Sequence, residues 1–90
     1  MSKEKVLYSC YLENFKCKYY ITKSIKTFSD NKNKIITYGV KIDLVNHNSI
    51  KEQAILKEVG INENDVKEYI TNLYNRQVTP KALKHIATNI

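Results

Sequence analysis

The chain has 90 residues, of which 42% are hydrophobic and 27% charged, and its formal net charge is +6. This length suits one domain, and the composition is that of a folded protein, which excludes a disordered chain. Two glycines and one proline exclude a collagen-like or Gly/Pro-rich low-complexity segment. No apolar run approaches the roughly 20 residues that cross a bilayer, and no signal-peptide core follows Met1. We expect a cytoplasmic protein without a membrane contact.

The positive charge comes from fourteen lysines and a single arginine, Arg76. Ten asparagines and eleven isoleucines accompany them, a composition that an AT-rich coding sequence also produces. Residues 1–45 contain nine lysines and four acidic residues (+5), whereas residues 46–90 contain six basic and five acidic residues (+1). Any electrostatic surface is therefore expected in the first half. A nucleic-acid ligand would have to be held by lysine, although arginine is the usual reader of phosphates and bases.

The first half alternates between apolar and polar residues with the period of two that strands have. The residues predicted to face the core are Val6, Tyr8, Cys10, Leu12, Cys17, Tyr19 and Ile21. A turn is predicted over residues 13–16. A two-residue loop would place Cys10 opposite Cys17, and a four-residue loop would place Cys10 opposite Tyr19. We favour the four-residue loop, because glutamate is a poor occupant of a turn position with positive φ.

A second turn is predicted over the polar residues 29–34, followed by an alternating strand over residues 36–44 and a third turn over residues 46–49. Residues 50–60 fit two interpretations. Ser49 and Glu52 have the spacing of a capping box and Gly60 stands where a helix would end. As a strand, the same segment would put Ile55 and Val59 on one face. The hydrophobic period does not decide between these alternatives.

Two helices are predicted after the strands, over about residues 63–75 and 80–89. Asn62 has the position of an N-cap, and Thr79 followed by Pro80 is a strong start signal for the second helix. The prediction is a single α+β domain of residues 1–90: a three- to four-stranded antiparallel meander over about residues 5–59 with both C-terminal helices packed on one face. The predicted core consists of Tyr8, Cys10, Cys17, Tyr19, Ile21, Ile36, Tyr38, Val40, Ile42, Val66, Ile70, Leu73, Leu83 and Ile86.

Four short motifs together resemble a family of small uncharacterised proteins from low-GC Gram-positive spore formers, catalogued as a domain of unknown function. The motifs are Tyr20–Lys23, Tyr38–Ile42, Val66–Leu73, and Val78–Pro80 with Leu83. The resemblance covers about residues 11–88 and implies that residues 51–59 form a fourth strand. It implies no catalytic residue, cofactor or substrate. The second helix departs from the pattern, with Lys81, Lys84 and His85 where acidic residues are expected.

No catalytic or metal-binding pattern stands out. The sequence contains no nucleophile elbow, no glycine-rich phosphate loop and no spaced pair of carboxylates on an apolar background. Cys10, Cys17, His47 and His85 are four candidate zinc ligands, but structural zinc sites use ligand pairs two to five residues apart. We therefore expect a protein that is not an enzyme and that holds no metal or cofactor, with both cysteines as free thiols.

The candidate binding site is the sheet face that the helices leave open. If Tyr19 and Cys17 face the helices, one set of lysines and tyrosines faces outward: Tyr11, Lys18, Tyr20, Lys26 and Lys41. Aromatic rings among lysines can stack on bases and bind phosphates, although tyrosine is also an ordinary residue for a wet sheet face. The leading hypothesis is a non-catalytic regulatory or adaptor protein that binds a protein partner, a second copy included. The alternatives are a nucleic-acid accessory factor in transcription or recombination and a small inhibitor from a mobile element.

Overall fold

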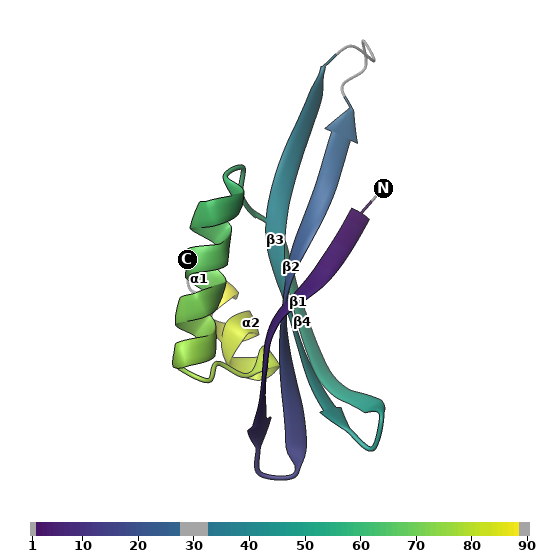
Figure 1. Cartoon of the computed structure of the whole chain (residues 1–90), viewed down its shortest axis with the longest axis vertical. Coiled ribbons are helices and arrows are strands. Elements are labelled where there is room, and N and C mark those ends of the chain that lie inside the picture. Colours follow the sequence, from purple (N-terminus) through teal and green to yellow (C-terminus); the bar gives the residue numbers. More distant parts are fainter. Residues whose placement is uncertain (1, 28–32, 89–90) are drawn as a thin grey trace.

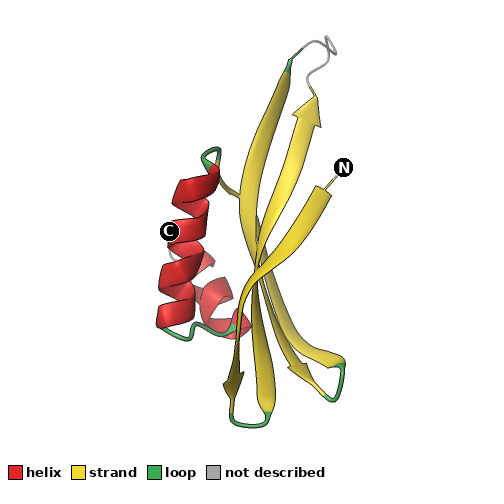
Figure 2. Cartoon of the chain, in the orientation of Figure 1, coloured by secondary structure: helices red, strands yellow, loops and turns green. Residues whose placement is uncertain are grey.

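The protein is a four-stranded antiparallel sheet with two helices on one of its faces, as the computed structural model shows for residues 2–27 and 33–88 (Figures 1 and 2). The strands follow one another in the order β1-β2-β3-β4. The elements are β1 (Ser2–Leu12), β2 (Phe15–Thr27), β3 (Lys34–Asn46), β4 (Ser49–Gly60), α1 (Glu63–Asn75) and α2 (Pro80–Thr88). The predicted α+β meander is thus confirmed.

Residues 49–60 form a strand, which decides the alternative that the sequence left open. β4 pairs with β3, placing Ala54 opposite Ile42, and both side chains are buried beneath the helices. His47 and Asn48 join the two strands with φ angles of 51° and 64°. Two consecutive positive φ angles are typical of the tight turn that suits twisted antiparallel strands. Long-range pairing with β3 thus overrides the local helix signals.

The turn between β1 and β2 contains two residues, Glu13 and Asn14, so the predicted four-residue loop is wrong. Cys10 pairs with Cys17 instead of Tyr19. Glu13 adopts a φ of 57°, although glutamate is a poor occupant of a turn position with positive φ. The strand pairing that follows this turn is long enough to outweigh the local cost of one residue. Of the turn predicted over residues 29–34, residues 29–32 lie outside the described residues.

A β-bulge interrupts β1 and reverses the sheet faces to which the side chains of its first half point. The pairing with β2 shifts between Val6 and Tyr8, which leaves Leu7 as an extra residue. Because successive side chains of a strand point to opposite faces, one extra residue exchanges the faces on either side of it. Val6 therefore pairs with Tyr20 and faces away from the helices. The prediction that Val6 faces the core is wrong for this reason.

The core lies between the sheet and the helices and is centred on tyrosines. Tyr19 is fully buried, and its hydroxyl donates a hydrogen bond of 2.9 Å to the backbone oxygen of Val78. The ring of Tyr74 on α1 stacks on Tyr8 at 4.5 Å between centroids and meets Tyr19 edge to face at 5.7 Å. The buried hydrophobic residues are Cys17, Tyr19, Ile21, Val40, Ile42, Ala54, Val66, Ile70, Leu73, Val78 and Leu83.

Two predicted core residues, Ile36 and Ile86, are each 39% exposed, so their assignment to the core is wrong. Ile36 continues the alternation of β3 and pairs with Ile25, but this part of the β2–β3 hairpin projects beyond the helices (Figure 1). The nine-residue helix α2 buries Leu83 while Ile86 stays exposed. Sequence periodicity shows which face a residue takes, but it does not show where the covering layer ends.

The starts of both helices follow the predicted capping signals. The side chain of Asn62 accepts a hydrogen bond of 3.1 Å from the backbone N–H of Asp65. The hydroxyl of Thr79 accepts one of 3.2 Å from the backbone N–H of Ala82, and Pro80 is the first residue of α2. These bonds satisfy backbone donors that have no partner in the first helical turn. The caps thereby fix where each helix begins above the sheet.

Candidate functional site

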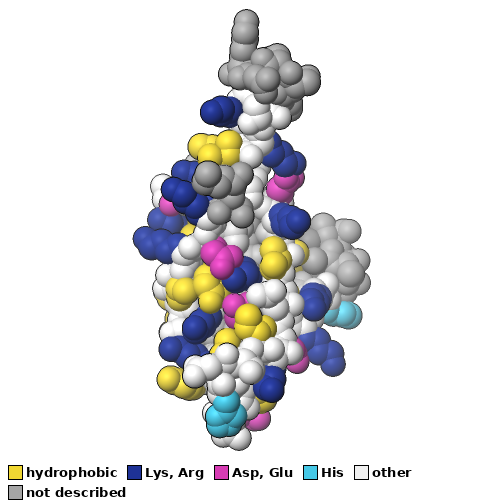
Figure 3. All heavy atoms as spheres, turned by 90° about the vertical axis from the view of Figure 1, so that its right-hand side faces the viewer, with side chains coloured by type: hydrophobic (Ala, Val, Ile, Leu, Met, Phe, Trp, Pro, Cys, Tyr) yellow, Lys and Arg dark blue, Asp and Glu magenta, His cyan; other side chains and the backbone are white. Residues whose placement is uncertain are grey.

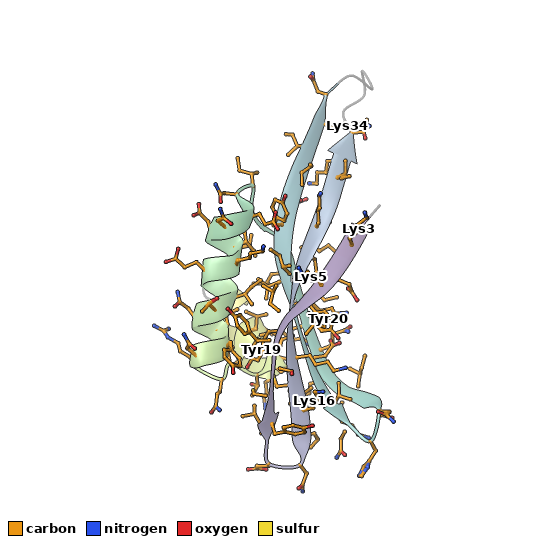
Figure 4. All side chains as sticks on the ribbon, viewed as in Figure 1. Lys3, Lys5, Lys16, Tyr19, Tyr20 and Lys34 are labelled. Carbon is orange, nitrogen blue, oxygen red and sulfur yellow. The ribbon has the colours of Figure 1, made fainter. Side chains whose placement is uncertain are left out.

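The outer face, by which we mean the sheet face turned away from the helices, presents two rows of side chains across the sheet. One row consists of Val6, Tyr20, Lys41 and Ile55, and the neighbouring row consists of Ser9, Lys18, Asp43 and Gln53. Figure 4 shows Tyr19 on the helix side and Tyr20 on the opposite side, as the alternation of β2 predicts. All four strands thus contribute to the centre of this face.

Lys41 lies at the middle of the outer face and is only 8% exposed. Its ammonium nitrogen lies 2.6 Å from Oε1 of Glu4 and 3.8 Å from Oδ2 of Asp43. It also sits 4.2 Å from the centroid of the Tyr20 ring. Asp43, 3% exposed, accepts a further hydrogen bond of 2.8 Å from Gln53. We call these five residues the Lys41 cluster.

The electrostatics of the Lys41 cluster keep its central charges paired. Burial alone would lower the pKa of Lys41, but the hydrogen bond to Glu4 and the charge of Asp43 outweigh it, so the pKa is raised. Burial, together with the charge of Asp43, raises the pKa of Tyr20. Lys41 is therefore a cation and Tyr20 a neutral phenol at physiological pH. The ammonium group of Lys41 and the carboxylates of Glu4 and Asp43 thus find their partners within the chain itself.

The five predicted site residues do not form one continuous surface. Lys18, Tyr20 and Lys41 lie together at the centre of the outer face. Tyr11 is largely exposed but pairs with Lys16, four residues and roughly 13 Å along β2 from Tyr20. The nitrogen of Lys16 lies 5.9 Å from the centroid of the Tyr11 ring.

Lys26 lies at the other end of β2, six residues and roughly 20 Å from Tyr20. It is exposed and forms an ion pair with Glu58 of β4. Both Lys26 and Lys41, which the sequence predicts as binding residues, are paired with acidic side chains of the same chain.

Two exposed apolar side chains, Val6 and Ile55, flank the Lys41 cluster. They are 46% and 47% exposed, and they occupy the two edge strands of the row that contains Tyr20 and Lys41. Figure 3 shows hydrophobic side chains near the middle of this face, with basic and acidic side chains among and around them. Sequence reasoning missed Val6 because of the bulge. Ile55 was noted only as part of a segment whose structure was ambiguous.

A shallow hollow of about 240 Å³ adjoins the Lys41 cluster on the outer face. Ile55 and Lys57 of β4 line one side of it, and Thr22 and Ser24 of β2 line another. Lys3, Glu4 and Lys41 complete the lining. The hollow is large enough for part of one side chain of a partner, and its walls offer both apolar and hydrogen-bonding atoms.

The four candidate zinc ligands are not gathered together. Cys10 and Cys17 face each other across β1 and β2, His47 lies in the turn between β3 and β4, and His85 lies on α2. Within residues 2–27 and 33–88 there is no group of three or more histidine, cysteine or acidic side chains that could hold a metal ion. Across the same residues, no helix has both the length and the apolarity to cross a membrane.

The fold and this outer face define a small α+β protein with one covered and one open sheet face. The chain belongs to a family of unknown function, DUF6514, whose model matches residues 3–90. The resemblance to a domain of unknown function is thereby confirmed. Searches of curated proteins and of solved structures find no match for this chain.

Proposed function

We propose that this protein is a non-catalytic regulatory or adaptor protein that binds another protein through its outer face. The observation that carries the proposal is the arrangement of exposed Val6 and Ile55 on either side of a buried, internally paired lysine. Protein interfaces typically combine an apolar centre with polar groups whose hydrogen bonds are satisfied. The residues proposed for binding are Val6, Lys18, Tyr20, Ile55 and Lys57.

A protein partner fits this face better than a nucleic acid does. A nucleic-acid surface needs free cations for phosphates and free rings for bases. Lys41 is paired with Glu4, and its ammonium group already covers the ring of Tyr20. Two of the features that favoured nucleic acid in the sequence are thus used within the chain. The outer face would therefore bind a phosphate backbone weakly.

The partner that this face suits has apolar groups to meet Val6 and Ile55 and acidic groups to meet the neighbouring lysines. Lys18 and Lys57 flank the Lys41 cluster on β2 and β4 and have no ion pair among the described residues. A second copy of the chain would bring the same lysines and a net charge of +6. An acidic protein would gain attraction where a second copy meets repulsion. The lysine-, asparagine- and isoleucine-rich composition supports an origin in a low-GC Gram-positive bacterium, and we place the binding event in its cytoplasm.

Capture of partners from a nuclease-treated extract of the source bacterium tests the proposal. Ile55→Glu should abolish capture of a partner that the wild type retains, because it puts a charge at an apolar contact beside the Lys41 cluster. Ile61→Glu is the matched control, since Ile61 is an exposed isoleucine in the connection between β4 and α1. Both variants must unfold at urea concentrations close to that of the wild type.

The outcomes of this experiment separate the alternatives. A partner lost by Ile55→Glu and kept by Ile61→Glu supports the proposal. Equal capture by both variants would contradict it. Light scattering that shows a dimer broken by Ile55→Glu identifies the partner as a second copy. Retention on DNA or RNA that weakens steeply with salt and needs Lys18 supports the nucleic-acid alternative instead.

A further inference from the structure

The two cysteines of the chain lie directly opposite each other on neighbouring strands. Cys10 of β1 and Cys17 of β2 are register partners, and both are free thiols. They stand two pairs away from the turn at Glu13, because the pairs Leu12–Phe15 and Tyr11–Lys16 come between. Cys17 is in the buried core, and Cys10 packs against its edge. Both side chains therefore point to the helix side of the sheet.

This placement is close to the geometry of a disulfide. Directly opposite residues of antiparallel strands have Cα atoms roughly 4.5 to 5.5 Å apart, within the range of about 4.4 to 6.8 Å that disulfides adopt. Their Cβ atoms are about 4.5 to 5.5 Å apart, whereas a disulfide draws them to about 3.5 to 4.5 Å. The strands would have to close by up to about 1 Å at this pair. A bond formed with such strain is more easily reduced than a relaxed one.

The two thiols differ in their access to solvent. Cys17 is fully buried, whereas Cys10 is partly exposed on the edge strand β1. Burial raises the pKa of Cys17, and the neighbouring Cys10 thiol adds to this effect. A reagent from solution therefore meets Cys10 first. Cys17 is shielded from the reagent but lies next to the sulfur of Cys10.

We propose that Cys10 and Cys17 form a reversible disulfide by thiol–disulfide exchange with a small disulfide such as oxidised glutathione. The Cys10 thiolate attacks one sulfur of the reagent, and the first thiolate of the reagent leaves. The Cys17 thiolate then attacks the Cys10 sulfur of this mixed disulfide and releases the second thiolate. The reagent gains two electrons and the two protons of the cysteines, and the chain gains one S–S bond. Disulfides of this kind in a reducing compartment are usually transient and redox-sensing.

The site is placed to affect the contact between β1 and α1. Tyr8 is two residues from Cys10 on the same strand and stacks on Tyr74. Its hydroxyl also hydrogen-bonds with that of Thr71 at 2.8 Å. Drawing β1 toward β2 at Cys10 moves the strand that supports these contacts. The near-ultraviolet circular dichroism of the stacked tyrosines should therefore change on oxidation.

The test treats the reduced, folded full-length chain with oxidised glutathione and follows its intact mass. We expect the wild type to lose the mass of two hydrogen atoms with no bound glutathione, and to regain it with excess reduced glutathione. Cys17→Ser should stop at one glutathione on Cys10. Cys10→Ser should react at least tenfold more slowly, because the remaining thiol is buried.

A double variant, Cys17→Ser with Lys18→Cys, is the matched control. It moves the second cysteine by one residue, so that it lies opposite Ser9 on the other face of the sheet. This variant should bind glutathione and form no internal disulfide. The proposal is overturned if the wild type keeps two free thiols, accumulates bound glutathione, or cross-links chain to chain. It is also overturned if the double variant forms the internal bond as readily as the wild type.

Discussion

Gly39 is the residue whose identity the fold constrains most directly. An added Cβ atom would lie 2.1 Å from the backbone oxygen of Leu56 and 2.6 Å from that of Lys57. The same Cβ atom would lie 2.7 Å from Oγ1 of Thr22. The backbone of β4 approaches Gly39 this closely because the pairing of β3 with β4 shifts between Tyr38 and Val40. Only a residue without a side chain fits beneath this irregular segment.

We expect Gly39→Ala to lower the free energy of unfolding by roughly 3 kcal/mol, since backbone atoms must move to admit the methyl group. Gly60→Ala is the control, because its added Cβ would have 3.4 Å to the nearest side-chain atom, on Val66. The control should change stability by less than about 1 kcal/mol. Urea denaturation at pH 7 measures both. Equal losses in the two variants would show that the close approach at Gly39 does not decide stability.

At the scale of an element, α2 is anchored by one fully buried leucine. Leu83 is completely inaccessible, whereas Ile86, one turn further along, is substantially exposed. We expect Leu83→Ala to cost between about 2 and 5 kcal/mol through lost burial and the cavity that it leaves. Ile86→Ala, on the same helix, should cost less than about 1 kcal/mol. Thermal and urea unfolding of the pair would contradict this anchoring if the two losses were similar.

Most of the elements follow from local sequence, but β4 and the register of the strands do not. The alternation of β2 and the caps at Asn62 and Thr79 are local patterns, and each predicts its element correctly. The bulge at Leu7 and the two-residue turn at Glu13 arise from pairing between strands, which no local pattern records. These two features decide that Val6 faces outward and that the cysteines meet.

The candidate site is less predictable than the fold for a similar reason. The sequence shows that Tyr20 and Lys41 share a face, because alternation places them there. Asp43 is two residues from Lys41 on β3, so alternation places it on this face as well. The sequence does not show that Glu4 of β1 pairs with Lys41. That ion pair depends on the register of β1, β2 and β3 and on the bulge in β1.

At the scale of the whole molecule, stability should fall in alkaline solution. The folded state raises the pKa of Lys41 above its ordinary value of 10.5, through Glu4 and Asp43 acting against burial. Its stabilising contribution is complete below 10.5 and is lost as the pH rises through the higher folded value. For Tyr19 and Tyr20, burial itself raises the pKa values above 10.0. Unfolded tyrosines ionise first, so they too favour unfolding above about pH 10.

Urea unfolding at pH 8, 10 and 11 measures this decline. Lys41→Met should be less stable at pH 8, because Asp43 then remains buried without its cation. From pH 10 upward it should lose less stability than the wild type does. Lys51→Met, at an exposed position of β4, should follow the wild type. A flat profile for the wild type would show that the buried charges make no net contribution.

The internal neutralisation of Lys41 also shapes what any molecule laid on the sheet would encounter. Removing water from a lysine ammonium group costs free energy, and at most binding surfaces this cost arises when the partner binds. Here Lys41 is already largely dehydrated in the folded protein, before any partner binds. Complexes formed on this side should therefore show a large negative heat-capacity change, the mark of apolar contact, and their dependence on salt should come from Lys18 and Lys57 rather than from Lys41.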